Sequence, residues 1–308
     1  MNRLKIYIQP RILETPYVEK LKQTFPTIDF VDQVDPSVVA CIVYPNFLNK
    51  DNLSVLPRLQ WAQSLMVGYN QVDQATFKAK KIVFTNAKDV YAITIAEDII
   101  TKMLVINRNV KKYIHQMDEG IWKPHRFEPE IHGSTIGFLG SGSLANAAAI
   151  RLKAFGATLI TYRKSDLPNP IFDQTFTGES GLKQVLSQSD YVVITLPLNE
   201  NTLKLINAEK LSWMKKEAVL INVGRGEVVD QDALIDALQK GQLRGAGLDV
   251  MTPEPLPKES PLWTMENVFI TPHNAPSSPY MMSRLYDLVE DNIKRFMEQK
   301  PLKNTVIF

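Results

Sequence analysis

Residues 135–145 read TIGFLGSGSLA, an apolar run that leads through Gly140-x-Gly142-x-x-Ala145 into a segment with helical spacing. In this pattern the first glycine permits a tight turn, the second lets the backbone approach a pyrophosphate, and a small third residue lets helix and strand pack closely. The helix N-terminus adds unpaired N–H groups and a positive dipole end. A tight turn without a ligand is the alternative, but the order strand, loop, helix and second strand favours a dinucleotide site. The residues expected to contact the cofactor here are Gly140, Ser141, Gly142, Ser143 and Leu144.

The second strand of such a fold normally ends in an acidic residue that hydrogen-bonds the adenosine ribose. Here the run ATLITY (157–162) continues into Arg163 and Lys164, and no carboxylate follows until Asp166. A carboxylate would repel a ribose 2′-phosphate, whereas a guanidinium binds it through two hydrogen bonds. A solvated pair of surface charges is the alternative. We predict a preference for NADP over NAD, with Arg163 and Lys164 beside the 2′-phosphate.

Short apolar runs alternate with helix-compatible segments on both sides of this loop. The strand candidates are residues 4–8, 28–32, 38–44, 59–65, 81–85, 134–140, 157–163, 191–197, 218–224, 245–250 and 267–273. The runs are solidly apolar, as in strands that a parallel sheet buries on both faces. Strand–helix alternation predicts such a sheet with helices covering it. We therefore expect an α/β protein with two doubly wound parallel-sheet domains, the second inserted into the first.

Two long amphipathic segments flank the second series of strands. Residues 93–117 read as a single, unusually long helix. Its apolar positions Ile95, Ile99, Met103 and Ile106 share one face. A loop with Pro and Gly follows over residues 119–134 and marks a boundary. The last long helix is expected at about residues 279–298, shared with the first domain.

The composition excludes several classes of protein. The chain has 308 residues, with 35 Lys and Arg against 33 Asp and Glu and a formal net charge of +2. Hydrophobic residues make up 44% and charged residues 22%, which excludes a disordered, collagen-like or coiled-coil chain. Near-neutrality over this length excludes bulk electrostatic attraction to nucleic acid or anionic membranes. We therefore expect neither as a partner.

Cys41, the single cysteine, lies in the apolar run VVACIVY (38–44) and cannot form an internal disulfide. A buried small hydrophobic residue is a better interpretation than a reactive thiol. The N-terminal MNRLKIYIQP has too short an apolar stretch for a signal peptide, and no run approaches the roughly 18 apolar residues of a membrane span. The expected compartment is the reducing cytoplasm.

Three further segments end strands of the second domain, and each carries one residue with a chemical use. These are Arg225 in INVGRGEVVD (221–230), Glu254 in GAGLDVMTPEPLP (245–257) and His273 in NVFITPHNA (267–275). An Arg binds a carboxylate through two hydrogen bonds, a His exchanges a proton near neutral pH, and a neighbouring Glu favours the charged imidazolium. Taken singly, each residue is better explained as an ordinary surface or loop residue. Their joint placement beside a dinucleotide loop favours a catalytic set.

Five segments together resemble a known family. They are GFLGSGSLA, TLPLNENTLKLIN, MKKEAVLINVGRGEVVDQDALIDAL, GAGLDVMTPEPLP and ITPHNA. In this order they resemble the D-isomer-specific 2-hydroxyacid dehydrogenase family, and the resemblance covers nearly all of the chain. It implies a flavodoxin-like substrate-binding domain, residues 1–92 and 285–308, and an inserted Rossmann NAD(P)-binding domain, residues 93–284.

The resemblance also implies roles for individual residues. The family's catalytic triad corresponds to Arg225, Glu254 and His273. By resemblance, the Arg binds the carboxylate and carbonyl of a 2-keto acid, and the His protonates the oxygen as hydride arrives from nicotinamide. The Glu orients and charges the His.

Further cofactor and substrate contacts follow from the same resemblance. Leu196 and Pro197 match the stretch along adenine and ribose, and Val223 and Asp249 match positions near the nicotinamide carboxamide. In the first domain, SLMVGYN (64–70) resembles the loop whose backbone amides bind the substrate carboxylate. This implies Val67 and Gly68 as substrate ligands, together with Arg225 and His273. No metal is implied.

The helix that begins ITIAED (93–98) resembles the family's interdomain and dimer-forming helix, which implies a homodimer through residues 93–117. Three positions depart from the family pattern. Asn70 stands where Asp is usual, Asp98 where His is common, and Arg163 where the ribose-binding acid is usual. The first two leave substrate and interface details open, and the third agrees with NADP.

The leading hypothesis is an NADPH-preferring reductase that converts a small 2-keto acid to the D-2-hydroxy acid, with His273 as general acid–base. Glyoxylate or hydroxypyruvate is the expected substrate, and branched or aromatic keto acids stay open. Tyr44 and Met66 lie in segments that can face a substrate, although we expect Tyr44 in the core. The alternative is a non-catalytic, dinucleotide-sensing protein that binds a partner, like the family's corepressor relatives. The absence of a long disordered tail or basic region weakens that alternative.

Overall fold

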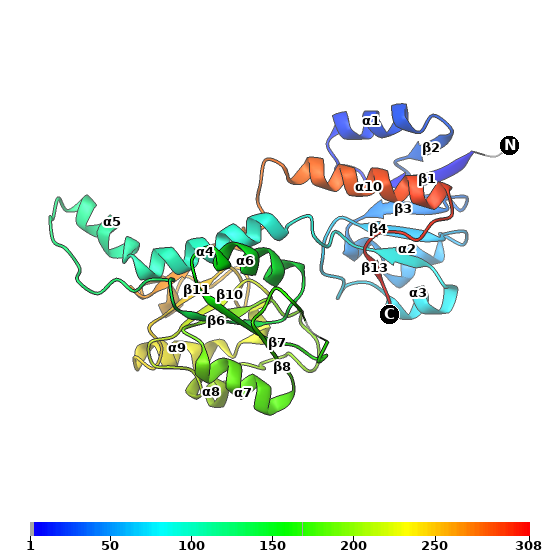
Figure 1. Ribbon diagram of the computed structural model, residues 1–308. Helices are drawn as coiled ribbons and strands as arrows, with labels where there is room; N and C mark the ends of the chain where they lie inside the picture. The colour runs from blue at the N-terminus through cyan, green and yellow to red at the C-terminus, as the bar shows by residue number, and fades with distance from the viewer. Residues whose placement is uncertain (1–2, 168) are drawn as a thin grey trace. The chain divides into compact units, whose positions relative to one another are not determined.

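The computed structural model describes residues 3–167 and 169–308, which divide into two compact units. Unit 1 comprises the described residues up to Tyr91 together with Ser278–Phe308, and unit 2 comprises Ala92–Ser277 (Figure 1). Each unit is built around its own predominantly parallel sheet with interleaved helices. The expected α/β class with two parallel sheets is confirmed.

The sheet of unit 1 has the strand order β13-β5-β4-β3-β1-β2. Its strands are β1 (Leu4–Ile8), β2 (Ile28–Val31), β3 (Ala40–Val43), β4 (Trp61–Ser64), β5 (Val83–Thr85) and β13 (Thr305–Val306). The first five pair in parallel, in the 2-1-3-4-5 order of flavodoxin-like folds. β13 pairs antiparallel with β5 and was not among the expected strands.

Helices cover both faces of this sheet. They are α1 (Thr15–Thr24), α2 (Lys50–Ser54), α3 (Gln74–Lys80) and α10 (Met281–Met297). Because successive side chains of a strand point to opposite faces, Ile6 of β1 belongs to the core that contains Leu285 of α10. Its neighbour Tyr7 belongs to the core that contains Phe77 of α3. The solidly apolar strands are therefore buried on two sides.

The sheet of unit 2 has the order β12-β11-β10-β9-β6-β7-β8, with every described pair parallel. Its strands are β6 (Thr135–Leu139), β7 (Thr158–Tyr162), β8 (Gln174–Phe176), β9 (Tyr191–Ile194), β10 (Val219–Asn222), β11 (Gly245–Leu248) and β12 (Val268–Ile270). This is the Rossmann order, which reverses between β6 and β9. The short edge strand β8 was not expected from the sequence.

The helices of unit 2 lie on both faces of its sheet, except that the helix Val110–Asp118 extends away from it (Figure 1). They are α4 (Ala92–Asn107), α5 (Val110–Asp118), α6 (Ser143–Lys153), α7 (Gly178–Gln188), α8 (Ala208–Ser212) and α9 (Gln231–Gln239). α4 packs on α6 and on β10 to β12. The other face is covered by α7, α8 and α9, which contribute Leu186, Leu211 and Leu238 to the core.

The segment expected to form one helix over residues 93–117 forms two. α4 ends at Asn107, and Asn109 adopts the left-handed conformation with φ 51° before α5 begins at Val110. Asn tolerates this conformation better than most residues because its short polar side chain can hydrogen-bond locally. α5 has no buried residue. The apolar spacing continues across the break, which is why the sequence suggested a single helix.

A second expectation is also wrong. Tyr44, expected in the core, is 40% exposed, because it lies just beyond the buried end of β3. Met66, which follows β4, is also exposed. None of the helices in residues 3–167 and 169–308 is long and apolar enough to cross a membrane.

Candidate active site

The loop after β6 lies at the point where the strand order of unit 2 reverses. Gly140 has a positive φ of 103°, and a Cβ there would lie 2.8 Å from Thr195 Oγ1. Thr195 follows β9 and donates its hydroxyl to the carbonyl oxygen of Leu139 over 3.1 Å. The backbone conformation and this close approach both require glycine at position 140. The loops after β6 and β9 are thus in contact at the edge where such folds bind ligands.

α6 begins in this loop without a side-chain cap. Gly142 is its N-cap residue, and among the residues described here no side chain caps its first N–H groups. A Cβ at Gly142 would meet no atom within 4 Å, so the backbone here borders open space. Ala145 is fully buried, as close packing of the helix requires. An uncapped helix N-terminus behind an open glycine fits a pyrophosphate group. Ser141, Ser143 and Leu144 lie in the same turn and are half-buried.

The loop after β7 presents the two predicted cations. The backbone N–H of Arg163 donates to the carbonyl oxygen of Phe176 over 3.0 Å, and its Nη1 donates to that of Leu167 over 3.0 Å. Lys164 is exposed. Within the described part of the chain, neither cation forms a salt bridge. Two cations without a protein counter-ion fit an added 2′-phosphate.

The remaining predicted cofactor contacts follow strands at the same edge of the sheet. Leu196 and Pro197 follow β9, Val223 follows β10, and Asp249 follows β11. Pro197 is exposed, whereas Val223 and Asp249 are buried. Parallel strands bring their carboxyl ends together, which places these residues along one edge with the β6 loop.

His273 and Glu254 form a direct pair. His273 Nδ1 lies 2.8 Å from Glu254 Oε2, with both side chains partly exposed. The second carboxylate oxygen, Oε1, accepts the backbone N–H of Met251 over 3.1 Å. The carboxylate is therefore held on both sides and fixes the imidazole ring through Nδ1. This leaves Nε2 as the ring nitrogen that can exchange a proton with a ligand.

The turn that carries Arg225 is held by hydrogen bonds within it. Asn222 shapes the turn from within: its Oδ1 accepts the N–H of Gly224 and its Nδ2 donates to the carbonyl oxygen of Arg225, both over 3.0 Å. Arg225 Nη1 donates to the carbonyl oxygen of Gly224 over 2.7 Å. In the described residues its guanidinium forms no salt bridge. Its remaining donors can bind a carboxylate.

Three polar residues at this edge were missed by sequence reasoning. Asn222 and Lys102 on α4 are buried, and Thr271 after β12 is half-buried. Lys102 pairs with Asp98, which the sequence had marked only as a departure from the family. Burial raises the pKa of the Asp98 carboxyl, and the hydrogen bond from Lys102 opposes this shift only in part. A Lys at helical spacing resembles an exposed charge, so no sequence signal revealed its burial.

The predicted substrate loop lies in unit 1, after β4. The carbonyl oxygen of Val67 accepts a hydrogen bond from Asn86 Nδ2 over 2.8 Å, and that of Met66 accepts the N–H of Ala87 over 3.1 Å. These contacts hold the loop by its carbonyl groups. Among the described residues, no acceptor binds the backbone N–H groups of Val67 and Gly68. Two free N–H groups in succession can bind a carboxylate.

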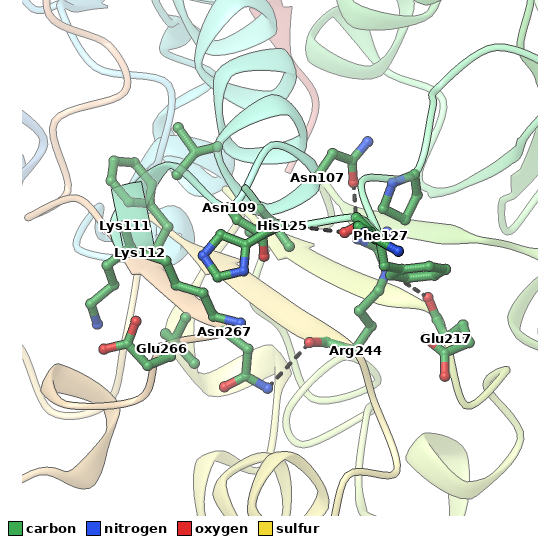
Figure 2. A pocket seen from close by; sticks show the side chains of 16 residues that line it. Asn107, Asn109, Lys111, Lys112, His125, Phe127, Glu217, Arg244, Glu266 and Asn267 are labelled. Carbon is green, nitrogen blue, oxygen red and sulfur yellow. Dashed lines mark hydrogen bonds between the residues drawn. The ribbon is translucent and has the colours of Figure 1, made fainter. Parts of the chain in front are cut away.

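A pocket of about 570 Å³ lies at the opposite edge of the unit 2 sheet (Figure 2). Glu217, Arg244 and Asn267 line it and precede β10, β11 and β12. Arg244 Nη1 donates to Asn107 Oδ1 over 3.0 Å, so the guanidinium is hydrogen-bonded to a neighbouring residue of the pocket wall. None of the predicted site residues lines this pocket, which is therefore separate from the candidate active site.

Comparison with known proteins gives consistent similarities. The family model described as D-isomer specific 2-hydroxyacid dehydrogenase, NAD binding domain, matches residues 100–275. The chain is 37% identical over 231 residues to glyoxylate/hydroxypyruvate reductase B of Pectobacterium carotovorum subsp. carotovorum, covering 73% of this chain and 72% of that protein.

Solved structures resemble the whole chain. An NADPH-dependent glyoxylate/hydroxypyruvate reductase from Sinorhizobium meliloti, in complex with citrate, is similar with a TM-score of 0.82 and 29% identity, covering 99% of this chain and 97% of that one. A D-isomer specific 2-hydroxyacid dehydrogenase from Xanthobacter autotrophicus, in complex with NADPH and MES, is similar with a TM-score of 0.84 and 26% identity, covering 100% and 98%.

Proposed function

Because this chain belongs to the D-isomer-specific 2-hydroxyacid dehydrogenase family, we propose that Arg225, Glu254 and His273 carry out its reduction of a small 2-keto acid. The chain is an NAD(P)-dependent oxidoreductase. The observation that carries the residue assignment is the 2.8 Å contact between His273 Nδ1 and Glu254 Oε2. It joins an acid–base group to a fixed carboxylate at the cofactor edge of a Rossmann sheet.

The proposed reaction adds a hydride and a proton across the keto group. The hydride at C2 of the substrate would come from NAD(P)H when it is bound. His273 donates a proton from Nε2 to the keto oxygen, which yields the D-2-hydroxy acid, and Glu254 stabilises the imidazolium that this step consumes. In the reverse direction the neutral His273 accepts the proton from the hydroxyl group.

Arg225 is a proposed ligand of the substrate carboxylate, and the loop at Val67 and Gly68 is a proposed substrate-binding segment. Arg225 has guanidinium donors without a carboxylate partner in the described chain, which supports this role. The free N–H groups of Val67 and Gly68 support a matching role for the loop in unit 1. Each contact favours a substrate that has a carboxylate next to its carbonyl group.

NADPH is the proposed preferred cofactor, with NADH as the weaker one. Gly140 to Leu144 would hold the pyrophosphate, and Arg163 and Lys164 the 2′-phosphate. Leu196, Pro197, Val223 and Asp249 would line the remaining length of the dinucleotide. Two similar structures support this choice, because the X. autotrophicus protein is in complex with NADPH and the S. meliloti reductase is NADPH-dependent.

Glyoxylate and hydroxypyruvate are the proposed substrates. The curated relative is named for both, and the S. meliloti neighbour is named for the same pair. The test is NADPH oxidation, followed at 340 nm, over a panel of 2-keto acids with small, branched and aromatic side chains. We expect turnover with the small acids and its loss in His273→Ala. Tight NADPH binding without turnover of any keto acid would contradict an enzyme and favour the sensor.

We further propose a homodimer formed through α4 and α5. α5 has no buried residue, and Met117 and Trp122 are 79% and 100% exposed. Large apolar side chains left uncovered on one helix and the loop after it are typical of a protein–protein contact. The proposed compartment is the cytoplasm, where the single Cys41, fully buried in β3, needs no disulfide partner.

A further inference from the structure

Lys102 is a fully buried cation on α4. A Cβ on Gly247 of β11 would lie 2.7 Å from Lys102 Cβ and 3.1 Å from its Cδ, so the aliphatic stem lies over bare strand backbone. Lys is almost never fully buried unless its charge is paired. Here the partner is Asp98, one helical turn earlier, whose side chain is 15% exposed.

The ammonium group also contacts the segment that carries His273. Lys102 Nζ donates to Thr271 Oγ1 over 2.7 Å, and Thr271 Oγ1 donates to Asp249 Oδ1 over 2.6 Å. An ammonium group has donors and no acceptor. The Thr271 hydroxyl must therefore accept from Lys102, and its own proton is directed to Asp249. Lys102 thus fixes the direction of both hydrogen bonds in the series that runs from Lys102 through Thr271 to Asp249.

Asp249 in turn accepts hydrogen bonds from the backbone around His273. Its Oδ1 accepts the N–H groups of Asn274 and Ala275 over 2.9 and 3.1 Å. Its carbonyl oxygen accepts the N–H of His273 over 2.8 Å. His273 itself has a φ of 51°, a left-handed conformation that persists only where the surrounding structure holds it.

We propose that Lys102 is a positioning residue for His273. It fixes the Thr271 hydroxyl and, through it, the Asp249 carboxylate, which keeps His273 in the left-handed conformation that pairs it with Glu254. Asp98 supplies the charge that allows the ammonium to be buried, so the two residues act as one unit. The inference rests on the proposed catalytic role of His273.

Two variants interrupt this series of hydrogen bonds at different points. Thr271→Val removes the linking hydroxyl but leaves the pair of Lys102 and Asp98 in place, and Lys102→Met removes the ammonium at similar volume. We expect each to lower kcat by about ten- to a hundredfold, because small misplacements of a catalytic group have large effects on rate. KM for the keto acid and Kd for NADPH should stay within about threefold. The double variant should lose no more than the worse single variant, because both interrupt the same interaction.

Asn107→Ala is the matched control. Asn107 is buried on the same helix but hydrogen-bonds Tyr191 and Arg244 instead. The Tm of the Asn107→Ala variant should fall while its kcat stays near that of the wild type. If Thr271→Val loses no more kcat than this control at an equal loss of Tm, or if the two single losses multiply in the double variant, the positioning role is wrong.

A readout that does not need turnover separates this inference from the proposed function. The ¹⁵N resonances of the His273 ring, assigned by their loss in His273→Ala, report its Nδ1 contact with Glu254. We expect them to shift in Thr271→Val and to stay unchanged in Asn107→Ala. A wild-type protein that reduces no keto acid would overturn the function alone, whereas an unchanged His273 spectrum in Thr271→Val would overturn the positioning role.

Discussion

Gly226 and Met251 are in such close contact that a Cβ at Gly226 would lie 2.0 Å from the carbonyl oxygen of Met251. Gly226 directly follows Arg225, and the N–H of Met251 donates to Glu254. The turn that carries the proposed carboxylate ligand therefore rests on the loop that carries the partner of His273. The spacing between these two parts of the site depends on a residue that has no side chain.

Gly226→Ala should separate these two loops. The methyl group of Ala would lie 2.0 Å from the carbonyl oxygen of Met251, which is far too close, so one of the two loops must move. We expect kcat/KM to fall by about a hundredfold, measured by NADPH oxidation with glyoxylate. Gly178→Ala is the control, because a Cβ there meets no atom within 4 Å, even though its φ of 68° makes Ala unfavourable at that position. Equal activity in the two variants would count against the coupling of the loops.

Glu254→Gln should lower kcat with little change in KM. Gln keeps the size of the side chain and can still accept the N–H of Met251, but it removes the negative charge beside His273. Because the carboxylate holds the imidazole ring through Nδ1 in position for proton transfer, we expect a loss of at least about tenfold in kcat. Glu259→Gln, at an exposed site in the same loop, should behave as the wild type. A wild-type kcat in Glu254→Gln would remove Glu254 from the proposed mechanism.

Arg163→Asp should change the preferred cofactor from NADPH to NADH. The guanidinium can bind a 2′-phosphate, whereas a carboxylate repels it and can bind the ribose hydroxyl groups of NADH. The measurement is the ratio of kcat/KM for the two cofactors. Lys216→Asp, an exposed site with the same change of charge, controls for the overall field. An unchanged ratio in Arg163→Asp would show that Arg163 does not select the cofactor.

Asp35→Asn should destabilise unit 1 in a pH-dependent way. The hydrogen bond from Lys5, followed by those from Ser37, lowers the pKa of the Asp35 carboxyl to about 2 from its ordinary 3.8. The unfolded chain then binds the proton more readily, so this stabilisation is complete above the ordinary pKa and is lost as the pH falls towards 2. In thermal unfolding, the Tm difference from the wild type should be present at neutral pH and shrink on acidification. Asp32→Asn, at an exposed neighbour, should show little difference at any pH.

Trp122→Glu should weaken the proposed homodimer. The indole is 100% exposed in the chain described, and a carboxylate at the centre of an apolar contact would be costly to desolvate. We expect light scattering after gel filtration to show a smaller species than the wild type at equal concentration. Ile307→Glu, at a residue 94% exposed in unit 1, should leave the assembly unchanged. A wild type that is already monomeric would contradict the dimer.

The sequence was most informative where local pattern and topology agree. Arg225, Glu254 and His273 each follow an apolar run, and parallel strands necessarily bring their carboxyl ends to one edge. The sequence therefore predicted that these residues share an edge, and the structure adds the 2.8 Å contact between Glu254 and His273. Gly140 and Ala145 were predictable for a similar reason, since their roles depend on the next few residues alone.

The parts that could not be predicted depend on residues far apart in the chain. Lys102 is buried because Gly247 leaves room for its aliphatic stem and Thr271 accepts a hydrogen bond from its ammonium group, and neither relation is visible from the spacing on α4. The break at Asn109 was hidden because a single left-handed residue leaves the apolar spacing nearly intact. Tyr44 was misplaced because strand candidates read from the sequence extend past the true end of β3.

The construction of unit 1 from two separate stretches of chain has a consequence for biosynthesis. α10 supplies Leu285, Val289 and Ile293 to one core of unit 1, and β13 completes its sheet beside β5. Both elements leave the ribosome after the whole of unit 2. The inserted unit can therefore fold first during translation. The strands of unit 1, although they are synthesised earlier, lack the helix α10 that covers them until the end of synthesis. In that interval the apolar face of β1 and β3 that α10 will cover stays open to solvent, where it can associate with other apolar segments.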